Sequence, residues 1–266
     1  MNKEIELVSI KEGRGAPMPV FGEDIQTFLF DKDGTLIDLP SIWIPWAYDI
    51  HRHLAEVMPN CPFSLAEFGD AVGIWGEDEV DPKSPLAIAS LGEMQAVIAF
   101  LLYEKGVAWD SAVLFARDSI QYADGKQNSS AAIRPVHGVR ELLTELKKAE
   151  RVLGVVTADD TEKARVQLER VGLAEYFDFV IGSDQVQNGK PYPDMAYLAR
   201  DRHGIALGQT VIVGDTNADM QLGKSAGLKA TIGIAANSRN ETAHLAEADL
   251  IVTSYGELLD MMRMRR

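Results

Sequence analysis

Residues able to do acid–base and nucleophilic chemistry recur directly after short apolar runs of the chain. These runs, each ended by polar residues or glycine, predict buried strands that lead into loops. The polar residues after them are Asp31 and Asp33, then Thr157, then Lys190, and last Asp215 and Asp219. Because the carboxyl ends of parallel strands share one edge of a sheet, we expect these side chains to lie together.

The four carboxylates among these residues have a chemical consequence if they converge. Taken singly, an aspartate in a loop usually faces solvent or caps a helix. Four of them at one edge would repel one another and would not all stay ionised without a cation. Mg²⁺ prefers oxygen ligands of this kind, together with phosphate oxygens. The sequence therefore predicts a Mg²⁺ site.

The same residues suit phosphoryl transfer, which mainly needs positioning and neutralisation of charge. An aspartate can attack phosphorus and form an aspartyl-phosphate. Asp33 can protonate the leaving oxygen and then activate water. Thr157 can donate a hydrogen bond to the phosphoryl group, and Lys190 can neutralise its charge. Gly34 would let the backbone approach the phosphate closely.

Four segments together resemble the motifs of the haloacid dehalogenase superfamily of phosphohydrolases. They occur in the order of that family and cover about residues 26–251. The segments are residues 31–36 (DKDGTL), Thr157, residues 189–194 (GKPYPD) and residues 214–219 (GDTNAD).

This resemblance implies a role for each motif residue. Asp31 would be the nucleophile and a metal ligand, and Asp33 the general acid and base, with its backbone carbonyl on Mg²⁺. Asp215 would hold the metal, and Asp219 would support either the metal or the position of Lys190. The residues expected to contact the substrate are Gly34, Thr35, Thr157, Ala158 and Lys190.

The resemblance leaves more than one function open. An acid at Asp33 favours phosphate esters, and residues 135–139 resemble phosphoglycolate phosphatases and β-phosphoglucomutases. We expect a Mg²⁺-dependent phosphatase acting on a small-molecule phosphate monoester. The first alternative is a sugar phosphomutase, which uses the same motifs. The second is a non-catalytic binding protein, which the intact set of motif residues disfavours.

The elements that must position these residues alternate along the chain. Strands are predicted at 27–30, 152–156, 179–181 and 210–213, with short ones near Thr231 and Leu250. Helices between them include 194–203 and 218–226, and a last helix starts at Tyr255. Such alternation predicts an α/β fold with a Rossmann-like core, in which helices cover both faces of a parallel sheet.

The stretch from 39 to 132 differs from the rest, because it is rich in Trp, Ala, Leu and Met and has few strand-like runs. It predicts helices at 42–57, 64–74, 86–103 and 111–122, with breaks at 81–85 and 123–130. We therefore expect three parts. These are an N-terminal tail or edge extension (1–22), a discontinuous α/β core (23–38 and 133–266) and an inserted helical cap (39–132).

Some details of local structure and of the cap have two interpretations. Asp159 and Glu162 are spaced for a capping box at the start of a helix. Trp43 and Trp46 can line the entrance to the site or anchor the first cap helix. Residues 51–53 (HRH) can bind a second anionic group or form a solvated helix face.

Composition limits the partners of the protein. With 26 Lys and Arg against 40 Asp and Glu, the net charge of −14 opposes binding to nucleic acid. Cys61 is the only cysteine, and residues 1–15 lack an apolar run, so we expect a cytoplasmic protein. The longest apolar stretch, 94–103, is too short to cross a bilayer, which predicts no membrane association. We expect a monomer or homodimer.

Overall fold

The α/β core is built on a parallel sheet. The computed structural model describes residues 22, 24–127, 133–236 and 242–264, so the predicted tail at 1–22 lies almost wholly outside the described residues. Within them, six parallel strands pair in the order β5-β4-β1-β6-β7-β8. Their bounds are β1 Thr27–Phe30, β4 Val152–Val156, β5 Phe179–Ile181, β6 Thr210–Gly214, β7 Ala230–Ile234 and β8 Leu250–Val252.

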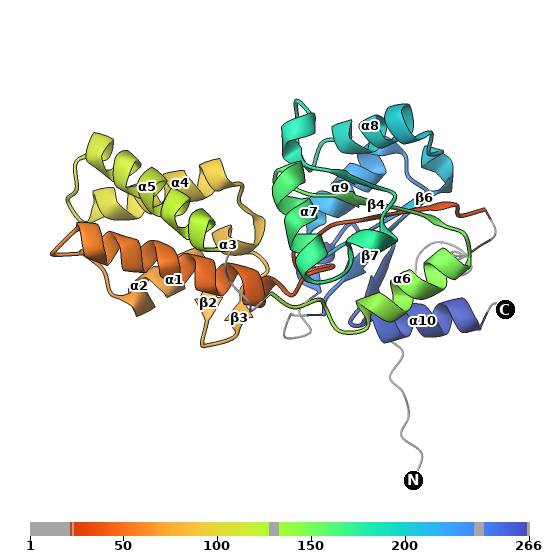
Figure 1. The fold of residues 1–266 in the computed structure, drawn as a ribbon, viewed down its shortest axis with the longest axis horizontal. Helices are drawn as coiled ribbons and strands as arrows, with labels where there is room; N and C mark the ends of the chain where they lie inside the picture. The colour runs from red at the N-terminus through yellow and green to blue at the C-terminus, as the bar shows by residue number, and fades with distance from the viewer. Residues whose placement is uncertain (1–21, 23, 128–132, 237–241, 265–266) are drawn as a thin grey trace, which may run out of the picture.

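Helices cover both faces of this sheet, as Figure 1 shows. Phe28 and Phe30 of β1 pack into one hydrophobic cluster, whereas Leu29 between them packs into another, because successive strand side chains point to opposite faces. The first cluster includes side chains of α6, α7 and α10, and the second includes side chains of α8 and α9. The bounds are α6 Val139–Lys148, α7 Thr161–Arg170, α8 Asp194–His203, α9 Asn217–Ala226 and α10 Tyr255–Arg263. The prediction of a Rossmann-like core is confirmed.

A separate group of helices lies beside the core and has its own hydrophobic cluster (Figure 1). We refer to its described residues, 39–127, as the helical unit. It also contains a two-stranded antiparallel hairpin. Its elements are α1 Leu39–Val57, α2 Leu65–Val72, β2 Ile74–Trp75, β3 Glu79–Val80, α3 Pro85–Ile88, α4 Leu91–Glu104 and α5 Trp109–Gln127.

Three local predictions in the helical unit were wrong. The helix expected at 86–103 is two helices, because Ser90 caps α4 in a box with Glu93. The helix expected at 64–74 stops at Gly73, which is left-handed, and the hairpin follows. The break expected at 123–130 is helical as far as Gln127, and residues 128–130 lie outside the described residues.

The aromatic and basic residues of α1 mostly serve packing. The Trp46 indole is buried and donates to Asp124 at 2.9 Å, which favours the anchoring interpretation. His51 contacts the carbonyl oxygen of Phe63, and His53 lies 2.9 Å from the Ser119 hydroxyl. Both histidines are half-buried, whereas Arg52 is exposed and pairs with Asp49 at 3.0 Å, so residues 51–53 are not a fully solvated face, and anion binding there stays a prediction.

The predicted capping box at Asp159 was also wrong. Asp160, not Asp159, precedes α7, and its side chain makes no capping bond. The Asp159 carboxylate is buried and pairs with Lys32 instead. None of the described helices is long and apolar enough to cross a membrane.

Candidate active site

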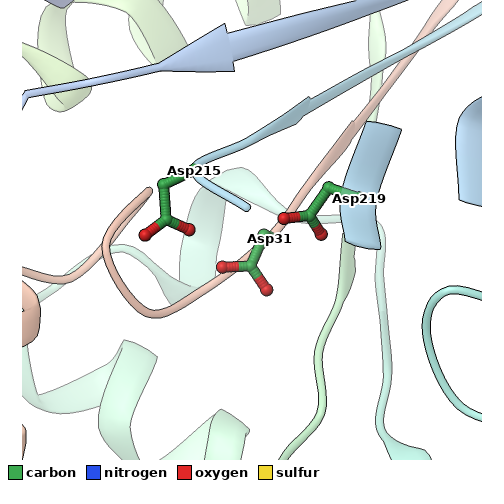
Figure 2. Close-up of side chains that lie close together, drawn as sticks. All are labelled: Asp31, Asp215 and Asp219. Atoms are coloured by element: carbon green, nitrogen blue, oxygen red, sulfur yellow. The ribbon is translucent and has the colours of Figure 1, made fainter. Parts of the chain in front are cut away.

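Three of the predicted aspartates meet at the carboxyl end of the sheet. Asp31 follows β1, Asp215 follows β6, and Asp219 lies in the first turn of α9. One carboxylate oxygen of each lies within 4.8 Å of the others, and Figure 2 shows the three side chains together. β1 and β6 are neighbours in the middle of the sheet, where the strand order reverses, which is the usual place for a site in such sheets.

Lys190 reaches this group from the loop after β5. Its ammonium contacts Asp31 Oδ1 and lies 2.6 Å from Asp219 Oδ1, and its side chain is only 7% exposed. The other oxygen of Asp219, Oδ2, accepts bonds from the backbone N–H (3.1 Å) and hydroxyl (2.7 Å) of Thr216, a capping box for α9. Asp219 therefore both holds Lys190 and belongs to the carboxylate group that could hold a metal ion.

The loop after β1 lies against Asp215. Gly34 has a φ of +80°, and a Cβ built on it would lie 1.9 Å from Asp215 Oδ2, so only glycine fits there. The Thr35 hydroxyl donates to Asp215 Oδ1 at 3.3 Å, and the Thr35 carbonyl accepts from the hydroxyl of Tyr255 at 2.7 Å. The loop and the buried Tyr255 thus fix the position of the Asp215 carboxylate.

Thr157 and Ala158 follow β4 at the same edge of the sheet. The Thr157 side chain is buried, and its hydroxyl oxygen accepts from the backbone N–H of Asp159 at 3.2 Å. This bond uses the oxygen as acceptor and leaves the hydroxyl proton to be donated elsewhere. Ala158 is exposed.

Asp33 turns away from the aspartate group and joins a second ionic network. The ammonium of Lys32, a fully buried side chain, contacts Asp33 Oδ1 and lies 3.0 Å from Asp159 Oδ2. It also donates to Gln167 Oε1 on α7 at 2.6 Å. Among the described residues, the carboxylates that could hold a metal ion are those of Asp31, Asp215 and Asp219, without Asp33. The contact of the Asp33 backbone carbonyl with the metal stays a prediction, as does its role as acid and base.

The electrostatics of the first group follow from burial and crowding. Burial raises the pKa of Asp31 to about 7, with Lys190 opposing the rise and Asp219 and Asp33 adding to it. Burial, together with the charges of Asp31 and Asp219, also raises the pKa of Asp215. For Lys190, burial would lower the pKa, but the charges of Asp219 and Asp31 outweigh it and raise it. The group carries more negative charge than one lysine balances.

This donor set fits a hard divalent cation. Carboxylate oxygens that are buried, close together and reluctant to ionise are stabilised as anions when such a cation binds between them. Gly34 and Thr35 lie against the Asp215 carboxylate, whose oxygen lies within 4.8 Å of one of Asp31, so the two carboxylates together would hold one cation. The residues present are therefore those that a Mg²⁺ site requires.

We expect Mg²⁺ to stabilise the protein more at high pH than at low pH. A carboxyl with a raised pKa favours the folded state below its ordinary pKa of 3.8, and that stability is lost as the pH rises through about 7 for Asp31. Mg²⁺ offsets this loss by pairing with the ionised form. The rise in the thermal unfolding midpoint on adding Mg²⁺ should therefore be larger at about pH 8 than at about pH 5. An equal or smaller rise at the higher pH would contradict the assignment, and Asp215→Asn should diminish it.

A cleft next to the site lies between the core and the helical unit. Gly34 and Asp215 form part of its wall, and the helical unit contributes Leu39, Val80 and Pro82. The cleft therefore joins the aspartates to side chains of the helical unit.

Four residues of the site escaped the sequence-based prediction: Lys32, Asp159, Gln167 and Tyr255. Lys32 had one signal, since it is a charged residue between two predicted catalytic aspartates. Asp159 lay two residues beyond Thr157, but its spacing to Glu162 matched a helix cap. Gln167 and Tyr255 carried no local signal, because only the tertiary fold brings them to the loop after β1.

The chain matches known proteins over most of its length. Residues 102–233 match the family described as Haloacid dehalogenase-like hydrolase. A phosphoglycolate phosphatase from Shigella dysenteriae is 37% identical over 241 residues, which cover 89% of this chain and 92% of that protein.

Solved structures share the fold. A predicted phosphoglycolate phosphatase from Haemophilus somnus superposes with a TM-score of 0.68 at 21% identity and covers 90% of this chain and 98% of its own. A β-phosphoglucomutase from Clostridium difficile superposes with a TM-score of 0.61 at 16% identity, covering 91% of this chain and 98% of its own. Likeness at this level of identity concerns the fold alone.

Proposed function

The chain belongs to the haloacid dehalogenase-like hydrolase family, and from that premise we propose that it hydrolyses a small-molecule phosphate monoester through an aspartyl-phosphate on Asp31. The observation that carries this proposal is the group of Asp31, Asp215 and Asp219, with Lys190 paired to two of them. The relative at 37% identity, a phosphoglycolate phosphatase, supports the substrate class.

In the first step an oxygen of Asp31 attacks phosphorus. Lys190 contacts Asp31 Oδ1, and we assign to this oxygen the proposed contact with Mg²⁺ as well, so that Oδ2 is the attacking atom. The bond from Oδ2 to phosphorus forms, the bond from phosphorus to the alcohol oxygen breaks, and Asp33 gives its proton to that oxygen. Lys190 and the Thr157 hydroxyl neutralise charge on the phosphoryl oxygens.

In the second step water attacks the phosphorus of the aspartyl-phosphate. Asp33, ionised after the first step, accepts a proton from the water as the new bond forms. The bond between phosphorus and Asp31 breaks, inorganic phosphate leaves, and both aspartates return to their starting states. The two steps require one carboxyl to act first as acid and then as base, and burial raises the pKa of Asp33 while Lys32 opposes the rise.

The proposed cofactor is Mg²⁺, held by the carboxylates of Asp31 and Asp215. When bound, it supplies positive charge that neutralises the phosphoryl oxygens and orients the substrate. Asp219 serves to hold Lys190, through the 2.6 Å contact described above.

We further propose that residues 39–132 form a cap over the core at 23–38 and 133–266. The helical unit has its own hydrophobic cluster and borders the cleft beside Asp215. Lys163 of the core pairs with Asp124 of the helical unit at 3.2 Å. Movement of the cap about such contacts would admit substrate and exclude water.

The phosphomutase alternative has weaker support. The mutase likeness is to solved structures of 16% and 21% identity, which concerns the fold alone, whereas a phosphatase relative reaches 37% identity in sequence. A non-catalytic role is disfavoured because Lys190, Asp31 and Asp219 form a buried ionic group, an arrangement that is costly to bury and is typical of active sites.

The test is phosphate release from a panel of small esters, including phosphoglycolate, sugar phosphates and an aryl phosphate. We expect release that depends on Mg²⁺ and stops when a chelator is added. Interconversion of sugar phosphates that requires a sugar bisphosphate, without net phosphate release, would instead identify a mutase. If the folded protein showed neither of these activities, the proposal would be overturned.

A further inference from the structure

Lys32 stands out because it is a charged side chain with no exposed surface. Its ammonium has three protons, and it faces three acceptors: Asp33 Oδ1, Asp159 Oδ2 at 3.0 Å and Gln167 Oε1 at 2.6 Å. Its charge is balanced inside the protein. Burial would lower the pKa of Lys32, but the charges of Asp159 and Asp33 outweigh it and raise it.

The loop does not need this charge in order to form. The backbone carbonyl of Lys32 accepts from the N–H groups of Leu36 (2.8 Å) and Ile37 (2.9 Å), and these bonds close the turn after β1. Apolar side chains in place of Lys32 and Asp159 together would fill the space without the cost of burying charges. The charge of Lys32 is therefore not explained by the closing of the turn. Within the site, the side chain that the ammonium contacts is that of Asp33.

We propose that Lys32, itself held by Asp159 and Gln167, is a positioning residue that fixes the carboxylate of Asp33 for proton transfer. The inference rests on the proposed function, in which Asp33 is the acid and base. Lys32 occupies Oδ1 of Asp33, so Oδ2 is the oxygen that exchanges protons with the leaving alcohol and with water. Proton transfer needs an approach of about 3 Å, which a carboxylate free to rotate meets only part of the time.

The pairing of Lys32 with Asp159 joins two motifs that are far apart in sequence. Asp159 lies beyond Thr157, at the end of β4, and its pKa, which burial alone would raise, is lowered by the charges of Lys32 and Lys163. Asp159 therefore stays anionic and keeps Lys32 in place. Through this pairing, the orientation of the Asp33 carboxylate depends on the loop that carries Thr157, which is predicted to donate a hydrogen bond to the phosphoryl group.

The test is Lys32→Met, which keeps an unbranched side chain only one atom shorter and removes its charge. Because Asp33 protonates the leaving oxygen, kcat/KM for an alkyl phosphate should fall about 100-fold. An aryl phosphate, whose leaving group needs little protonation, should lose less than about tenfold. A merely structural role would lower kcat/KM for both esters equally, and that result would overturn the inference.

Two further variants separate positioning from folding. In Lys32→Met the buried carboxylate of Asp159 loses its partner Lys32. The double variant Lys32→Met with Asp159→Asn removes that carboxylate as well, so the alkyl and aryl esters can be compared in it if Lys32→Met alone does not fold. In an Asp33→Asn background, Lys32→Met should cost no further activity, because residues that act through one another are not additive. A full additional loss there would also contradict the inference.

The controls distinguish this inference from the proposed function. Lys147→Met makes the same substitution at a lysine that pairs with Asp178 at the surface, and it should leave both kcat/KM values unchanged. If the wild type released no phosphate, the proposed function and the inference would both be overturned. An active wild type with an equally active Lys32→Met would overturn the inference alone.

Discussion

Asp31→Asn is expected to lower Mg²⁺-dependent phosphate release by at least about 10,000-fold, the size of effect seen when a nucleophile is removed. The amide of asparagine does not form the covalent intermediate, and it removes the charge that pairs with Lys190. Asp31 lies at the end of β1, in contact with that lysine and grouped with Asp215 and Asp219.

The measurement is steady-state release from the best ester of the panel, with folding checked by thermal unfolding. Asp178→Asn is the matched control, because Asp178 precedes β5 at the amino ends of the strands, the edge of the sheet opposite to the site. Its carboxylate accepts a hydrogen bond from the backbone N–H of Leu153. It should keep wild-type activity. If release persisted in Asp31→Asn, the nucleophile would be another group.

Gly34→Ala is expected to lower kcat/KM about 100-fold, since displacing a catalytic group by about 1 Å costs on that order. The new Cβ would lie 1.9 Å from Asp215 Oδ2, where no atom fits, so the carboxylate or the loop must move. Both carry predicted roles in the site, and the stabilising response to Mg²⁺ should weaken in parallel.

Gly204→Ala is the control for backbone strain. Gly204 also has a positive φ, +69°, but a Cβ there meets nothing within 4 Å. Both substitutions place alanine in the left-handed region at a cost of about 1–2 kcal/mol. Only Gly34→Ala should lose activity and the Mg²⁺ response. Equal activity losses in the two variants would show that strain, not the approach to Asp215, is responsible.

The core was predictable because its signals are local. The strands at 152–156 and 179–181 and the helix at 194–203 match the structure residue for residue. Buried parallel strands are short apolar runs ended by polar residues, and the helix begins after Pro193 and ends at a left-handed Gly204. The motif residues could be placed at one edge since strand ends in a parallel sheet share that edge.

The errors arose where tertiary contacts override local preference. Gly125 suggested a break, but α5 runs through it because neighbours such as Ala123 are buried and Asp124 binds Trp46. Asp159 has the spacing of a cap, yet Lys32, 127 positions earlier, pairs with it. A single sequence does not show such partners, so the aspartate group was foreseeable and the network around Asp33 was not.

The most direct test of the central claim is to trap the phosphoryl group on the protein. In Asp33→Asn, formation of the intermediate is slowed, but its hydrolysis loses its general base, so an ester with a good leaving group should let it accumulate. After a rapid acid quench, peptide mass spectrometry should find one phosphoryl group on Asp31, with Mg²⁺ and not with chelator. A phosphoryl group on any other residue, or turnover with none on the protein, would contradict covalent catalysis by Asp31.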